Sequence, residues 1–215
     1  LVGELLLLDA LCRRADDRHV GPVVQAWDGW SRSARDLTWE GTGVEIKTTT
    51  RTTSSHAVRG VHQIEPAAAT DDGPGESRLL LVSIGLRQTD PNVPALSIPS
   101  LVESIVARLT ASGASGLVYE FLKCVAMYGS ESGIGYEHAT MANEAPFTTP
   151  FSLTFIRGYD MADPAVEVLR RDDVLAHQHV DAQSLSFRVD LPATITLNNP
   201  IAGVRRVAEA ILGLN

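Results

Sequence analysis

The stretch GVEIKTTT, from Gly43 to Thr50, decides the fold of this chain because it reads as a β-strand with two chemically different faces. It alternates in polarity and is rich in β-branched residues, which is typical of strands. Side chains alternate along a strand, so Val44 and Ile46 point one way while Glu45 and Lys47 point the other, roughly 7 Å apart. The apolar pair holds the strand on a core, and the charged pair faces whatever lies across the sheet.

A second strand is predicted over residues 35–40, immediately before the turn chemistry of Gly41-Thr42-Gly43. An even-numbered loop such as Gly41-Thr42 would place Asp36 opposite Lys47, in one patch with Glu45. A three-residue loop would send Asp36 to the other face of the sheet. The site derived below therefore depends on this register.

Further elements extend outward from this hairpin, and their order indicates the fold class. Apolar spacing predicts helices over residues 1–11, 58–69, 100–109, 117–128 and after Pro200, and strands over 23–30, 35–40, 44–50, 79–86, 151–156 and 185–189. The first 86 residues thus read α-β-β-β-α-β, a mixed central sheet flanked by helices, which belongs to the α/β class. We expect a core over residues 1–90 and, over residues 91–215, a C-terminal α+β elaboration packed on it.

The bulk composition is that of a globular chain. With 215 residues, of which 44% are hydrophobic, the chain can bury a core as one domain or as a core with a large appendage. The apolar run Leu5–Leu8 is bracketed by Glu4 and Asp9, so it reads as neither a signal peptide nor a membrane span. We therefore expect a cytoplasmic protein with no membrane partner. The first residue, Leu1, suggests that residues precede it, and an upstream domain stays open.

The net charge of −8 argues against a protein that simply coats nucleic acid, because such proteins neutralise phosphates with Lys and Arg. The acidic excess lies mainly in the C-terminal part. Residues 1–65 hold eight basic and nine acidic side chains, whereas residues 66–215 hold ten and seventeen. The N-terminal part is near neutral, and several of its acids are assigned below to a metal ion that would cancel their charge.

The patch of Asp36, Glu45 and Lys47 indicates metal-dependent chemistry. Two neighbouring carboxylates repel each other, and burying either one costs several kcal/mol unless a cation compensates it. Oxygen ligands with few imidazoles favour Mg²⁺, with Mn²⁺ as a substitute, over zinc. Such an ion polarises a phosphoryl oxygen while a nearby Lys orients water, which is what phosphodiester hydrolysis needs. Glu4 reaches the same patch if the first helix crosses the sheet.

The choice of lysine at position 47 supports this interpretation. The chain has sixteen arginines but only two lysines, Lys47 and Lys123. A compact ammonium group can approach a water or a scissile phosphate in a way that a planar guanidinium cannot.

These residues resemble a known family. Asp36 followed by Glu45-Ile46-Lys47 is the PD-(D/E)XK nuclease pattern, and the α-β-β-β-α-β order is similar to the restriction-endonuclease-like core of that superfamily. Gly3-Glu4-Leu5, Arg35-Asp36-Leu37, Glu45 to Thr49, and His56 through Gln63-Ile64 together resemble the uncharacterised PD-(D/E)XK proteins of bacterial restriction and defence gene clusters. The proline that gives the motif its name is absent, since Arg35 precedes Asp36.

The resemblance implies metal-dependent cleavage of DNA that leaves a 5′-phosphate. It assigns Asp36, Glu45 and the Ile46 backbone carbonyl to Mg²⁺, and Lys47 to the attacking water. Glu4 would bind or orient a second metal or its water shell, and Gln63, from the second helix, would support Lys47 or a phosphate. Contacts to DNA phosphates are expected from three further residues: Arg51, His56 and Arg59.

Other interpretations of the same residues stay open at this point. Glu45 and Lys47 alone would be a weak surface ion pair on an exposed strand face. Glu4 could equally face solvent, Gln63 and His56 could cap a helix, and most arginines are merely solvated. A lone His177-x-His179 without a third ligand is usually no metal site. The three tryptophans are expected to pack in the core or on the sheet rather than stack on bases: Trp27, Trp30 and Trp39.

The sequence therefore predicts a Mg²⁺-dependent deoxyribonuclease that acts in a bacterial restriction or antiphage defence system. Its expected partners are DNA and either a second copy, so that both strands are cut, or other subunits of a defence complex. The alternative is a catalytically inactive DNA-binding or scaffolding subunit with the same fold. A third class, a structural domain without a nucleic-acid partner, would fail to bind DNA at any salt concentration.

Overall fold

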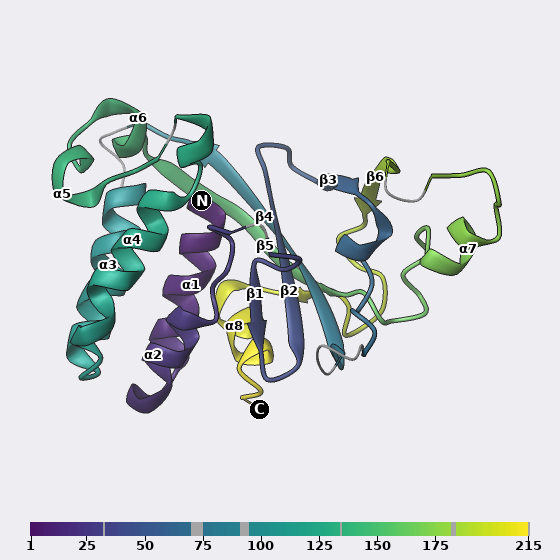
Figure 1. Cartoon of the computed structure of the whole chain (residues 1–215), viewed down its shortest axis with the longest axis horizontal. Helices are drawn as coiled ribbons and strands as arrows, with labels where there is room; N and C mark the ends of the chain where they lie inside the picture. The colour runs from purple at the N-terminus through teal and green to yellow at the C-terminus, as the bar shows by residue number, and fades with distance from the viewer. Residues whose placement is uncertain (32, 70–74, 91–94, 134, 182–183, 215) are drawn as a thin grey trace.

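A computed structural model of the chain describes residues 1–31, 33–69, 75–90, 95–133, 135–181 and 184–214 (Figure 1). The helices are α1 Val2–Arg14, α2 Asp17–Gln25, α3 Ile98–Ala111, α4 Val118–Met127, α5 His138–Met141, α6 Ala145–Thr148, α7 Arg171–Leu175 and α8 Val204–Ile211. The strands are β1 Leu37–Trp39, β2 Thr42–Thr49, β3 Ser54–Arg59, β4 Arg78–Gln88, β5 Phe151–Asp160, β6 Ser186–Leu191 and β7 Ile201–Ala202. Across these ranges, no helix has both the length and the apolar character that crossing a membrane would require.

The central sheet has five strands in the order β1-β2-β4-β5-β7. Only the β2–β4 pair is parallel, and the other three pairs are antiparallel. A separate two-stranded sheet pairs β3 with β6. This arrangement confirms the predicted mixed α/β fold, in which helices flank a central sheet.

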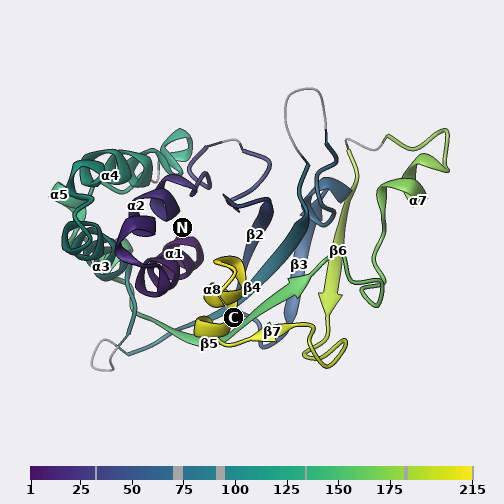
Figure 2. The ribbon, with the colours of Figure 1, turned by 90° about the horizontal axis from the view of Figure 1, so that it is seen from below.

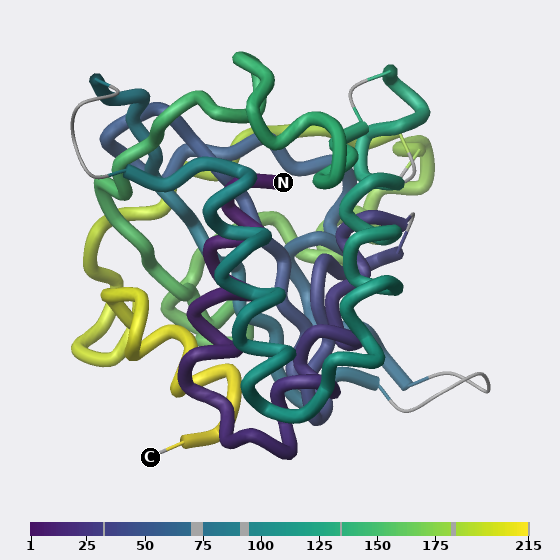
Figure 3. The backbone as a smooth tube through the Cα atoms, turned by 90° about the vertical axis from the view of Figure 1, so that its left-hand side faces the viewer, coloured from purple at the N-terminus to yellow at the C-terminus, as the bar shows by residue number. Residues whose placement is uncertain are grey.

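The two faces of the central sheet bury different layers. Leu80, Val82 and Ile84 of β4 belong to the larger hydrophobic cluster, which contains the leucines of α1 and residues of α2, α3, α4 and α8. Leu79 and Leu81 point the other way, into a smaller cluster with residues of β3, β5 and β6. Figure 2 shows helices α1 to α4 gathered on one side of the sheet and β3, β6 and α7 on the other, and Figure 3 looks onto the helical side. The near-continuous apolar run of β4 is thus explained by burial on both faces.

Two local predictions in the N-terminal part are wrong. The helix expected over residues 58–69 is replaced by β3 and a short 3-10 turn over Val61–Gln63. Gly60, with φ at 90°, lies between them in a conformation that a helix cannot use. The strand expected over residues 23–30 is absent: residues 23–25 end α2, whose Val20, Val23 and Val24 are buried, and Trp27 makes only an isolated bridge to Leu37.

Several boundaries also differ in the C-terminal part. Helix α3 begins at Ile98, two residues before the predicted start at residue 100, because the Ser97 side chain accepts from the Ser100 amide and caps the helix. The final helix begins at Val204 rather than near Pro200, and the short strand β7 intervenes. The short helices α5 and α6 lie between residues 128 and 151, where the sequence predicts no helix or strand.

Strands from both sides of residue 90 share both sheets. β4 pairs with β5, and β3 pairs with β6. The segment after residue 90 therefore packs on the core by completing its sheets, while the boundary at residue 90 itself stays a prediction.

Candidate functional site

The hairpin that carries the motif has a two-residue turn. Leu37 pairs with Val44 and Trp39 with Thr42, so the loop is Glu40-Gly41, with φ at 45° and 79°. Continuing this register by one residue brings Asp36 level with Glu45, not with Lys47 as expected. The shift is two residues, an even number, so Asp36 stays on the same face as both charged residues.

Asp36 lies at the end of the β1–β2 ladder, where its side chain replaces a main-chain acceptor. Its Oδ2 accepts a hydrogen bond of 2.6 Å from the Ile46 amide. Its own carbonyl turns away and accepts from the Asp28 amide at 2.9 Å. The Asp36 carboxylate is thereby fixed beside the middle of the Glu45-Ile46-Lys47 motif.

The environment of Asp36 is unfavourable to its ionised, negatively charged form. Burial first, then the charges of Glu4 and Glu45, raise the pKa of Asp36 to about 7, while the Ile46 hydrogen bond and Lys47 act in the opposite direction. A carboxyl group with a pKa in this range gains from a nearby cation, because the cation removes the repulsion. The raised pKa therefore marks a place where a positive ion would be stabilised.

Glu45 and Lys47 form the second part of the site, together with Gln63. Lys47 Nζ lies 2.8 Å from Glu45 Oε1 and donates to Gln63 Oε1 at 3.2 Å. The same Gln63 oxygen accepts from the Arg59 amide at 2.9 Å. The Glu45 side chain is only 7% exposed, so this is not the solvated surface pair of the alternative interpretation. Gln63 reaches Lys47 from the 3-10 turn, which corrects its predicted place on a helix.

Glu4 is held in place by hydrogen bonds from Trp27 and Tyr128. It is 7% exposed on α1, and its two carboxylate oxygens accept from Trp27 Nε1 at 3.0 Å and from the Tyr128 hydroxyl at 2.7 Å. Burial and the Glu4 carboxylate also raise the pKa of the Tyr128 hydroxyl, which therefore stays a donor. Glu4 is thus a buried acceptor whose charge acts on Asp36, and not the solvent-facing residue of the alternative interpretation.

The residues expected at DNA phosphates are not all in one place. Arg51 is exposed in the loop between β2 and β3, and Arg59 is exposed at the end of β3. His56 is 4% exposed, and its Nε2 lies 2.7 Å from Ser83 Oγ. Burial, with Lys47 and Arg188, lowers the pKa of His56 to about 4, so this imidazole is neutral at neutral pH. His177 and His179 are exposed after α7 and not on a strand.

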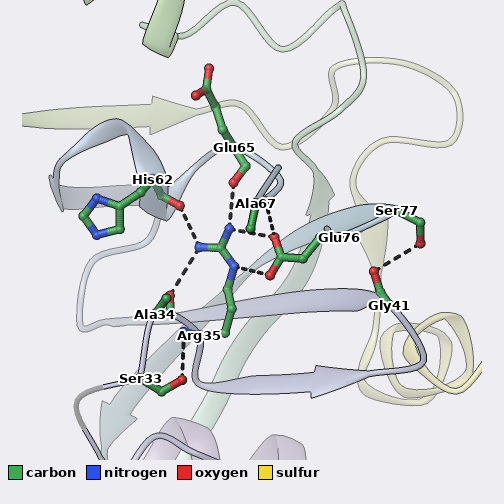
Figure 4. A network of polar contacts seen from close by, with 9 residues as sticks. All are labelled: Ser33, Ala34, Arg35, Gly41, His62, Glu65, Ala67, Glu76 and Ser77. Atoms are coloured by element: carbon green, nitrogen blue, oxygen red, sulfur yellow. Dashed lines mark hydrogen bonds and ion pairs between the residues drawn. The ribbon is translucent and has the colours of Figure 1, made fainter. Parts of the chain in front are cut away.

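Arg35 supports the site in a way that sequence reasoning missed. It is 5% exposed and makes a two-pronged ion pair with Glu76, both contacts being 2.7 Å (Figure 4). It also donates to the carbonyls of His62 at 2.6 Å and Glu65 at 2.7 Å. A side chain at Gly43 would collide with the Glu76 carboxylate. Arg35, the residue before Asp36, thus links the start of the β1–β2 hairpin to the connection between β3 and β4.

A hard divalent ion fits part of the predicted ligand set. Among the described residues, no hydrogen bond occupies Asp36 Oδ1 or Glu45 Oε2, which leaves one oxygen of each free for a cation. The N–H and C=O of one strand residue point to the same edge, so the Ile46 carbonyl points toward the edge where its amide meets Asp36. Each Glu4 oxygen accepts one hydrogen bond and keeps a further lone pair, so the metal role of Glu4 stays a prediction. No three His, Cys, Asp or Glu side chains gather as a metal cage within the described ranges.

The fold and this arrangement define a restriction-endonuclease-like protein, with Asp36 beside the Glu45-Ile46-Lys47 motif on a mixed sheet. A family model described as "Putative PD-(D/E)XK family member, (DUF4420)" matches residues 1–145, and the chain belongs to this family. The match confirms the resemblance to the PD-(D/E)XK family. No curated protein and no solved structure matches the chain.

Proposed function

We propose that this protein is a Mg²⁺-dependent DNA endonuclease that hydrolyses phosphodiester bonds. The observation that carries the proposal is the convergence at Ile46, where Asp36 binds the amide, Glu45 lies alongside and Lys47 bonds Glu45. Membership of the PD-(D/E)XK family supports it, because the members of that superfamily are generally nucleases.

Each residue of the site has a distinct role in this proposal. Asp36, Glu45 and the Ile46 carbonyl would hold the ion, which supplies charge stabilisation at a phosphoryl oxygen and a more acidic water. Lys47 orients the attacking water, and Gln63 holds the Lys47 ammonium in position through the 3.2 Å hydrogen bond. Glu4, held by Trp27 and Tyr128, would bind or orient a second metal ion or its water shell. Arg51 would contact a phosphate beside the cleaved bond.

The cellular setting belongs to the same proposal and rests on the resemblance alone. We propose a role in a bacterial restriction or antiphage defence system in the cytoplasm. The protein would act there as a homodimer or with other subunits of a defence complex. The 5′-phosphate product has the same basis.

One observation favours the second candidate function, a catalytically inactive DNA-binding or scaffolding subunit. Among the described residues no three His, Cys, Asp or Glu side chains form a metal cage, and both Glu4 oxygens already accept a hydrogen bond from Trp27 or Tyr128. A subunit of this kind would bind DNA through the same surface without cutting it.

Plasmid cleavage separates the two functions. We expect the wild type to nick or linearise plasmid DNA with Mg²⁺ and not with EDTA, and Lys47→Ala to lower the rate by about 100-fold or more. Lys123→Ala is the matched control, because Lys123 is the other lysine of the chain and is exposed on α4. Cleavage that persists in Lys47→Ala, or a wild type that binds DNA without cutting it, would overturn the nuclease proposal.

A further inference from the structure

A cleft of about 490 Å³ opens beside the candidate site, at the C-terminal end of β2. Its walls are Lys47 and residues 48–51 on one side, and Ser55, His56, Ala57 and Arg188 on the other. Three of the nine lining residues carry a positive charge, namely Lys47, Arg51 and Arg188, and none of the nine is acidic. In a chain with a net charge of −8, such a concentration of positive charge needs a specific reason.

Arg188 reaches this cleft from outside the family-matched region. It lies on β6, where it pairs with Ala57 of β3, and the family match ends at residue 145. Its Nη1 donates to the carbonyl and the hydroxyl of Ser55, both at 3.2 Å. These contacts hold the guanidinium over β3 at the cleft, although the residue as a whole is exposed.

The guanidinium keeps unused donors in this position. Nη1 makes both hydrogen bonds to Ser55, and within the described residues none is made by Nε or Nη2. Arginine presents its remaining N–H groups in a planar fork that matches the oxygens of a phosphate. The charges of Lys47 and Arg188 both lower the pKa of His56, after burial and against Asp190, so both charges are felt at one ring. The cleft therefore combines positive charge, free donors and the hydroxyls of Thr49, Thr50 and Ser55.

We propose that Arg188, with Arg51, binds a backbone phosphate of the DNA strand next to the bond that lies at Lys47, so that the C-terminal segment completes the substrate-binding surface. This rests on the proposed function, because it takes DNA as the ligand. It adds a substrate-binding residue that neither the motif nor the family match contains.

The test is the salt dependence of DNA binding in the absence of divalent ions. The dissociation constant of a short mixed-sequence duplex is measured by fluorescence anisotropy in EDTA over a series of salt concentrations. Each phosphate contact contributes about 0.9 to the slope of log K against log salt. We expect Arg188→Gln and Arg51→Ala each to reduce that slope by about one, and Arg188→Lys to restore most of it.

Two controls keep the result interpretable. Arg18→Ala removes an arginine whose side chain is 80% exposed on α2, and it should leave the slope unchanged. Arg188→Gln retains an amide that can donate to Ser55, so a thermal melt should match that of the wild type. A slope for Arg188→Gln equal to that of Arg18→Ala would overturn the inference, as would a wild type that does not bind the duplex. Failure of plasmid cleavage alone would overturn the proposed function and leave this binding result standing.

Discussion

Replacing Asp36 by Asn should make the metal-free protein more stable at alkaline pH, although it removes a proposed metal ligand. The folded state raises the pKa of Asp36 from 3.8 to about 7, mainly through burial and the charges of Glu4 and Glu45. Because the folded state holds the proton more tightly than the unfolded state, ionisation of this group costs folding free energy as the pH rises. Asparagine keeps an oxygen that can accept from the Ile46 amide and cannot ionise.

The expected difference in stability between Asp36→Asn and the wild type follows from the change in the pKa of Asp36 on folding. A difference of about three pKa units corresponds to about 4 kcal/mol, which is a ceiling because water at the sheet edge screens part of the repulsion. The cost is absent below about pH 4, grows between pH 4 and 7, and is complete above about pH 8. The advantage of Asp36→Asn should therefore approach a few kcal/mol at about pH 8 and fall below about 2 kcal/mol at about pH 5.

Urea unfolding of both proteins in EDTA, over this pH range, measures the difference directly. Contributions of carboxylates remote from Asp36 cancel in the comparison, so the difference reports Asp36 together with its neighbours Glu4 and Glu45. Adding Mg²⁺ at about pH 8 should then stabilise the wild type and leave Asp36→Asn unchanged, since the ion binds only the folded state that has its ligand. A stability difference that does not change with pH would refute the claim that burial and neighbouring carboxylates raise the pKa of Asp36. Equal stabilisation of both proteins by Mg²⁺ would refute the role of Asp36 as a metal ligand.

Two further predictions concern residues around the site. Because the folded state lowers the pKa of His56 to about 4, the unfolded state takes up this proton first as the pH falls from about 6.5 to 4. The free energy of unfolding of the wild type should therefore fall by up to about 3 kcal/mol over that range, and that of His56→Gln should fall less. Equal pH profiles of the two proteins in urea unfolding would contradict this. Arg35→Lys should cost about 2–4 kcal/mol, because an ammonium cannot reproduce the two-pronged contact with Glu76 and the carbonyl contacts in a buried site. Arg78→Lys is its control, because the Arg78–Asp160 pair is about one third exposed and the substitution should lower stability by under about 1 kcal/mol. Similar stability losses for both variants would show that the buried contacts of Arg35 contribute no more than an exposed ion pair.

The parts of the fold that could be predicted from the sequence are those with strong local periodicity. The β1–β2 hairpin, the buried run of β4 and the helices α1, α3 and α4 all have such patterns, and the structure contains each of them. The helix predicted over residues 58–69 is absent because Val58 and Arg59 end β3, which pairs with a strand about 130 residues later, and because Gly60 and a 3-10 turn follow. A partner this distant in the chain leaves no signal in the local pattern.

The candidate site shows the same division. Asp36, Glu45, Lys47, Gln63 and Glu4 could be picked out from residue type and spacing, and the structure brings the first four around the Ile46 edge with Glu4 behind Asp36. Residue type and spacing do not reveal Trp27, Tyr128 and Arg35 as supports of the site, nor Arg188, for which we propose such a role. Each acts through a tertiary contact, such as the 124-residue separation between Glu4 and Tyr128, that spacing along the chain cannot reveal.

The position of β4 in the central sheet has a consequence for synthesis of the chain. One of its neighbours, β2, is made first, but β5 begins at Phe151, after 62 further residues have followed Gln88. At typical ribosomal rates this takes about 3–12 seconds, during which one side of an apolar strand has open N–H and C=O groups. We expect the nascent chain to need protection from edge-to-edge aggregation over that interval.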